Sequence, residues 1–168
     1  SGNASGTATP KRNKTPEKKR VIWTQITPET KPASFAHYRL GEPSDITIYK
    51  NADGTPFGYV LRFETPEGKQ TLPFIYATDG TRKEWRFQGF STPRPLLGID
   101  LATQNPNATV LLVEGEKCVK HAQKHFNPKK LVVMSWVGGA NGIGASDFSA
   151  IEGRKAILWP DNDAAGMS

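Results

Sequence analysis

Three short apolar runs in the second half of the chain constrain its fold more than any other feature. The runs VLLV, LVVM and AILW occupy residues 110–113, 131–134 and 156–159. Continuous apolar runs of this length are typical of strands covered on both faces. Residues 116–126 lie between the first two runs, and their apolar side chains recur at helical spacing: Cys118, Val119, Ala122 and Phe126. We therefore expect buried strands alternating with helical segments in a parallel α/β sheet with right-handed crossovers, and we place Cys118 in the core.

A different period governs residues 46–87. Apolar side chains alternate with other residues there, most clearly in FGYVLRF at 57–63, and turn sequences rich in Gly, Asp and Pro separate the alternating segments. Period two with such turns predicts four short antiparallel strands. Pro73 cannot donate a backbone hydrogen bond, so it predicts that the third of these strands lies at a sheet edge.

The positive charge of the chain is concentrated at its start. The net charge is +6, and five of these six charges lie in residues 1–20, which contain no large apolar side chain. We predict a disordered basic arm there and a nearly neutral folded body, so the charge does not by itself indicate a large nucleic-acid surface. A single cysteine excludes an internal disulfide and a cysteine-based zinc site, which favours a reducing compartment such as the cytoplasm. Neither a membrane span nor a secretion signal is indicated.

Acidic residues follow two of the apolar runs. Glu114 ends the first run, and Asp161 and Asp163 come just after the third. Because sites in parallel sheets collect beyond the carboxyl ends of the strands, these carboxylates are candidates for one Mg²⁺ centre. Taken singly, each has a simpler interpretation, since a strand-end glutamate is often solvated and an aspartate often caps a helix.

These motifs, in this order, resemble the Toprim domain of bacterial and phage primases. The similarity rests on VLLVEGEKCV, a Gly-Gly loop and AILWPDNDAAG, and it extends upstream to residues 51–63 and 89–100. It implies an α+β chain in which a small antiparallel β-rich subdomain precedes a Rossmann-like, mostly parallel Toprim sheet. We accordingly expect a basic arm at 1–20, the β-rich subdomain at 21–100 and a partial Toprim domain at 101–168. The domain is expected to be truncated at its C-terminus, so the activity of whole relatives is not implied for this chain alone.

The resemblance also implies roles for individual residues. Glu114 would act as proton donor or acceptor or as metal ligand, and Asp161 and Asp163 would bind Mg²⁺ or Mn²⁺. The implied activity is synthesis of RNA primers from ribonucleoside triphosphates on single-stranded DNA, in phage, plasmid or mobile-element replication, with a helicase domain or partner. Two alternatives remain open, which are a Toprim nuclease or topoisomerase-like enzyme and a non-catalytic nucleic-acid-binding module.

Contacts to nucleic acid would have to come from the strand-rich part. The basic candidates are Arg62, Arg82, Lys83, Arg86 and Arg94. Trp85 is available for base stacking, although its alternation with Arg86 favours a core position for the aromatic ring and a solvated arginine. The loop GGANGIG lacks the spacing of a dinucleotide site, and His121 and His125 lack the intervening glutamate of a zinc motif. A short sheet with an exposed edge makes self-association an expectation.

Overall fold

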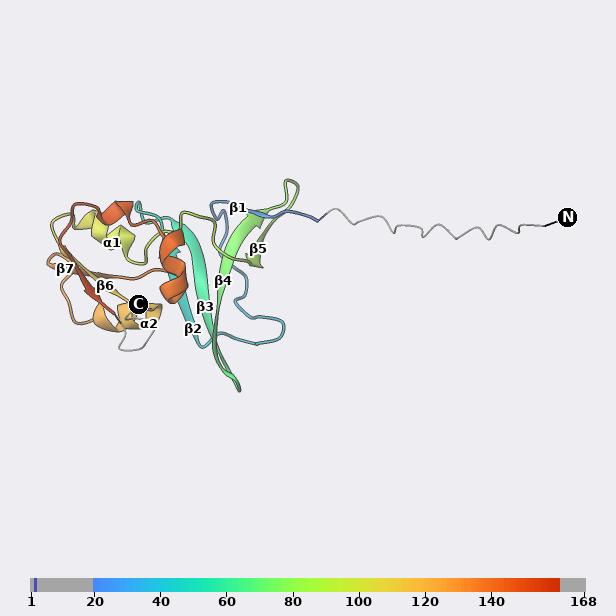
Figure 1. Ribbon diagram of the computed structural model, residues 1–168, viewed down its shortest axis with the longest axis horizontal. Coiled ribbons are helices and arrows are strands. Elements are labelled where there is room, and N and C mark those ends of the chain that lie inside the picture. Colours follow the sequence, from blue (N-terminus) through green and yellow to red (C-terminus); the bar gives the residue numbers. More distant parts are fainter. Residues whose placement is uncertain (1, 3–19, 161–168) are drawn as a thin grey trace.

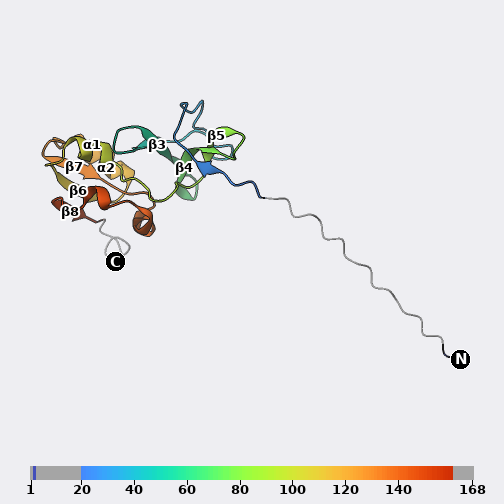
Figure 2. The same cartoon turned by 90° about the horizontal axis from the view of Figure 1, so that it is seen from above.

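The computed structural model describes Gly2 and residues 20–160. Two sheets lie side by side along the long axis of the molecule (Figures 1 and 2). One is a five-stranded antiparallel sheet and the other a three-stranded parallel sheet, accompanied by a few short helices. The chain is therefore an α+β protein, as the two hydrophobic periods predict.

The antiparallel sheet has the strand order β1-β4-β3-β2, and β5 also pairs with β4. Its strands are β1 (Thr24–Gln25), β2 (Asp45–Lys50), β3 (Pro56–Thr65), β4 (Gly68–Thr78) and β5 (Lys83–Phe87). The four strands predicted from period two are confirmed as β2 to β5. Five of their aromatic side chains share one cluster, in which the Trp85 ring stacks on Phe74 with centroids 5.5 Å apart; they are Tyr59, Phe63, Phe74, Trp85 and Phe87.

The edge position predicted from Pro73 is wrong for the strand as a whole, because β4 lies inside the sheet. Pro73 pairs with Val60 of β3, but β5 pairs only with Phe74 and the residues after it. At Pro73 itself β4 therefore has a strand on one side only, where a missing backbone donor is tolerated. The sequence rule holds locally and fails for the complete strand.

The parallel sheet consists of β6 (Thr109–Val113), β7 (Leu131–Met134) and β8 (Ala156–Trp159), in the order β7-β6-β8. Both neighbours of β6 run parallel to it, which confirms the prediction from the three apolar runs. The helical elements are α1 (Ile99–Gln104), α2 (Glu116–Ala122) and the 3-10 helices η1 (Gly139–Ala145) and η2 (Ser149–Ile151). Helix α1 was not predicted from the sequence. It spans the boundary expected between residues 100 and 101, where the β-rich subdomain was to end and the partial Toprim domain to begin.

Two burial predictions in this half are wrong. All four residues of β8 are exposed, and 67% of the Trp159 surface is accessible, because β8 is an edge strand that no described residue covers. Cys118 is exposed as well, since it faces a groove that it lines with His121, Phe126 and Trp159. Of the α2 residues only Val119 is fully buried.

One of the three hydrophobic clusters of the described residues joins the two sheets. Tyr49 and Ile75 of the antiparallel sheet belong to the same buried cluster as Leu111, Val119 and Val133 of the parallel half. The sheets thus bury apolar surface against each other, which fixes the position of the parallel strand ends relative to β2 and β3.

Candidate functional site

Glu114 lies where the central strand of the parallel sheet ends. It follows Val113 of β6 and is half-buried. Because β7 and β8 run parallel to β6, all three strands have their carboxyl ends at this edge, where ligands of parallel sheets collect. The predicted position of Glu114 at a strand end is confirmed, and its chemical role stays a prediction.

A buried serine holds the backbone next to Glu114. The N–H of Gly115 donates to the Ser135 hydroxyl oxygen over 3.1 Å, and Ser135 is completely buried at the end of β7. The backbone of Ser135 also exchanges hydrogen bonds with Leu97. Ser135 therefore ties three segments together behind Glu114. In the sequence, Ser135 is marked only as a small polar residue directly after an apolar run, which does not by itself indicate this role.

The glycine-rich loop after β7 packs directly against Glu114. A Cβ added to Gly139 would lie 3.3 Å from the Glu114 Oε1 atom, and one added to Gly142 would lie 1.7 Å from the Val137 carbonyl oxygen. The Trp136 ring N–H donates to the Gly139 carbonyl oxygen over 2.6 Å, which holds the loop in place. The glycines thus serve close packing beside the carboxylate, and a dinucleotide site is not required to explain them.

Asp161 and Asp163 lie outside the described residues. Strand β8 approaches Glu114 nevertheless, because Trp159 is the register partner of Val113. The chain therefore reaches Pro160 at the strand edge that carries Glu114. Within residues 20–160 no group of three or more acidic, histidine or cysteine side chains could hold a metal ion.

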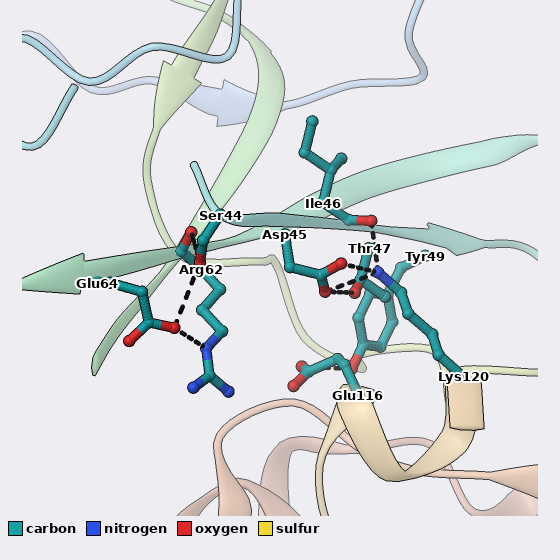
Figure 3. A network of polar contacts seen from close by, with 9 residues as sticks. All are labelled: Ser44, Asp45, Ile46, Thr47, Tyr49, Arg62, Glu64, Glu116 and Lys120. Atoms are coloured by element: carbon teal, nitrogen blue, oxygen red, sulfur yellow. Dashed lines mark hydrogen bonds and ion pairs between the residues drawn. The ribbon is translucent and has the colours of Figure 1, made fainter. Parts of the chain in front are cut away.

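A polar bridge connects the candidate site to the antiparallel sheet (Figure 3). The Tyr49 hydroxyl of β2 donates to Glu116 Oε1 over 2.9 Å, and burial together with this carboxylate raises the pKa of Tyr49 well above its usual value. One turn further along α2, Lys120 Nζ contacts both Asp45 carboxylate oxygens at 2.7 and 2.8 Å and the Ile46 carbonyl oxygen at 2.6 Å. Two residues of α2, the helix that directly follows Glu114, are thus anchored to one strand.

Glu114 faces a cleft of about 650 Å³ between the two halves. One wall comes from β2, β3 and β4, and the other from the loops after β6 and β7. Four cationic and three acidic side chains line it: Arg62, Lys69, Arg94, Lys117, Asp45, Glu114 and Glu116. Asp45 is paired with Lys120 and Arg62 with Glu64, so among the described residues Lys69, Arg94 and Lys117 are the cleft cations that form no ion pair, and they favour an anionic ligand.

The structure divides the basic candidates into two groups. Arg62 and Arg94 line the cleft with Glu114, although Arg62 also pairs with Glu64 over 2.7 Å (Figure 3). Lys83 and Arg86 lie outside the cleft lining, where Lys83 pairs with Glu29 and Arg86 pairs with Glu84 and stacks over Trp23. These outer contacts account for both residues structurally, and Arg82 likewise pairs with Asp79.

Two cleft cations, Lys69 and Lys117, were missed by reading the sequence. Lys69 sits beside the β3–β4 turn and Lys117 in the first turn of α2, and only the packing of the two halves brings them together. Trp85 is half-buried and packs against the aromatic cluster, so its predicted core position holds only in part; Arg86, predicted to be solvated, is half-buried over the Trp23 ring. His121 and His125 are exposed neighbours with ring centroids 5.0 Å apart.

No family model, curated protein or solved structure matches the chain. Among the described helices, none combines the length and the apolar character needed to cross a bilayer.

Proposed function

We propose that the chain carries part of the catalytic core of a primase-like Toprim protein, which joins ribonucleotides into RNA primers on single-stranded DNA with Mg²⁺ or Mn²⁺. The observation that supports this proposal most directly is the place of Glu114. Its carboxylate lies at the end of the central parallel strand and faces a cleft with four cationic side chains. Acidic groups that hold a metal and basic groups that hold phosphate are the combination that phosphoryl transfer requires.

Glu114 and the two aspartates that follow β8 in the sequence would fit a hard divalent cation. The Glu114 carboxylate lines the cleft, and Asp161 and Asp163 follow within four residues of Trp159, the register partner of Val113. Carboxylate oxygens are the ligands that Mg²⁺ prefers. Glu114, Asp161 and Asp163 would hold the ion, which when bound supplies charge neutralisation of a triphosphate and lowers the basicity of an attacking 3′-hydroxyl.

The other residues of the site would bind and orient the substrates. Arg62 and Lys69, from β3 and β4, would contact the phosphates of the template strand on one wall of the cleft. Lys117 would do so from the opposite wall. Ser135 and the α2 anchors would keep Glu114 at a fixed distance from these cations. A helicase domain or partner would deliver the single-stranded template.

Calorimetric titration of Mg²⁺ and Mn²⁺, with and without a ribonucleoside triphosphate, tests the metal centre. We expect binding to the unmodified chain that the triphosphate strengthens. Binding should be lost in Glu114→Gln and in the double variant Asp161→Ala/Asp163→Ala. The control is Glu152→Gln, an exposed acid outside the cleft lining, which should bind like the unmodified chain. Identical titrations for all variants would refute the metal centre.

Product analysis then separates the alternatives. Short RNA products on a single-stranded DNA template support the primase proposal, whereas cleaved DNA supports a Toprim nuclease or topoisomerase-like enzyme. Salt-sensitive DNA binding that survives the aspartate substitutions, without metal-dependent turnover, supports a non-catalytic binding module.

A further inference from the structure

Arg94 is a cation of the cleft whose side chain forms no hydrogen bond or ion pair with the other residues of 20–160. It is half-buried, its Nε atom is shielded from solvent, and this atom has no hydrogen-bond partner among the described residues. The Nε atoms of Arg86 and Arg154 share this feature, but their terminal nitrogens bond to Glu84 and to three backbone carbonyls, respectively. In residues 20–160, by contrast, no side-chain hydrogen bond or ion pair satisfies Arg94. A shielded donor such as this Nε without a partner among the described residues is costly, so a ligand that supplies an acceptor would stabilise it.

The backbone of Arg94 is held firmly. Its N–H donates to the Ala145 carbonyl oxygen over 2.8 Å, and its own carbonyl oxygen accepts from the Asp147 N–H over 2.8 Å. These two bonds attach Arg94 to the last residue of η1 and to the segment that follows it. The guanidinium therefore projects into the cleft from a fixed point, as a residue that recognises a ligand needs to do.

Two glycines keep the space between Arg94 and Glu114 free of side chains. A Cβ added to Gly138 would lie 3.6 Å from Arg94 Nη1, and one added to Gly139 would lie 3.3 Å from Glu114 Oε1. Gly138 has a φ of +91°, which favours glycine. The glycine pair thus lies against the candidate metal ligand on one side and against the guanidinium on the other.

We propose that Arg94 and the Gly138–Gly139 turn form a phosphate-binding subsite beside Glu114. A guanidinium offers several N–H donors in a planar fork, which matches the oxygens of a phosphate group. The inference deepens the proposed function and rests on it only for what carries the phosphate, which is either a nucleoside triphosphate or the backbone of a nucleic acid.

Binding of phosphate compounds to the full chain in EDTA tests the subsite apart from any metal. The probes are inorganic tripolyphosphate and a ribonucleoside triphosphate, measured by calorimetry, and a fluorescent single-stranded oligodeoxynucleotide, measured by anisotropy. We expect Arg94→Gln to raise the Kd about tenfold or more, the effect of losing a charge-assisted hydrogen bond. Arg39→Gln, the same change at an exposed arginine outside the cleft lining, should change the Kd less than about twofold.

The pattern across probes identifies the carrier. A loss for tripolyphosphate and the triphosphate but not for the oligonucleotide assigns the subsite to the incoming nucleotide, and the reverse assigns it to the nucleic-acid backbone. Equal affinities of Arg94→Gln and Arg39→Gln for every probe, or no binding by the unmodified chain, would overturn the proposal.

Chemical modification gives a second measurement that needs no variant. An arginine-specific dicarbonyl reagent should modify Arg94 in the free chain, and tripolyphosphate should protect it, while the exposed Arg39 stays reactive in both samples. Mass spectrometry of the two peptides reads the result, and equal modification of Arg94 with and without tripolyphosphate would contradict the subsite. If Arg94-dependent binding in EDTA persists while metal binding is absent, the subsite stands and the proposed metal centre fails. If metal binding is present but binding in EDTA does not depend on Arg94, the subsite is rejected and the proposed metal centre stands.

Discussion

At the scale of single residues, Asp79 shows how one carboxylate organises a turn. Its oxygens accept hydrogen bonds from the backbone N–H groups of Arg82 and Thr81 and from the Arg82 side chain. These bonds, with the Arg82 backbone contribution largest, lower the pKa of Asp79 to about 2. The charged form is thus favoured by folding, and the turn between β4 and β5 depends on it.

The Asp79 charge should stabilise the protein only above the pH at which the unfolded carboxyl ionises. A lowered pKa in the folded state stabilises above about pH 4, the ordinary range of an aspartate, and this contribution is lost as the pH falls towards 2. We expect Asp79→Asn to lower the urea midpoint at pH 7 and to approach the unmodified chain near pH 2. A difference that stays constant between pH 7 and pH 2 would contradict this account.

The same scale shows which site residues a sequence can reveal. Glu114, Arg62 and Arg94 could be proposed from the sequence. Glu114 ends an apolar run, and the two arginines are basic residues of the strand-rich part. Ser135 and Lys117 do not, because their importance comes from packing between segments far apart in the chain. Tertiary contacts of this kind leave no period in the sequence.

At the scale of elements, the bond between Tyr49 and Glu116 couples β2 to α2. A double-mutant cycle with Tyr49→Phe and Glu116→Gln should give a coupling energy of about 1.5 to 3 kcal/mol in urea unfolding, the range for a hydrogen bond to a charged group. Tyr38→Phe is the control, because Tyr38 is 82% exposed and its loss should leave stability nearly unchanged. Additive effects of the two substitutions would show that the bond contributes nothing.

Local sequence patterns predicted most helices and strands, but they failed to predict burial, which depends on the neighbouring elements. Period two found β2 to β5, and the apolar runs found β6 to β8. The burial of β8 and of Cys118 could not follow from apolarity, since burial depends on what packs against a strand or helix face. Helix α1 escaped notice because its six residues follow a proline-rich stretch and are too few to show a period.

At the scale of the whole molecule, the shared core predicts that the two sheets unfold together. Val119 is 1% exposed and lies in the cluster that joins them. We expect Val119→Ala to lower the free energy of unfolding by about 2 kcal/mol. The shift should be equal in two single-tryptophan proteins, one reporting on the antiparallel sheet through Trp85 and one on the parallel half through Trp136. Val21→Ala, at an exposed valine, is the control.

Two separate transitions, with only the Trp136 signal shifted by Val119→Ala, would mean that the halves fold independently. That outcome would favour the domain boundary expected from the sequence over the continuous core. Self-association through β8 is checked in the same samples, because it would make the Trp136 midpoint depend on protein concentration.

The double attachment of α2 to β2 has a mechanical consequence. A helix held at one point could rotate about that point. Here the Tyr49–Glu116 and Asp45–Lys120 contacts hold the same helix at two points one turn apart (Figure 3). Two such contacts oppose both translation and rotation of the helix against the strand, so we expect the width of the cleft beside Glu114 to change little when a ligand enters. A cleft of constant width would favour ligands of matching thickness, whatever their charge.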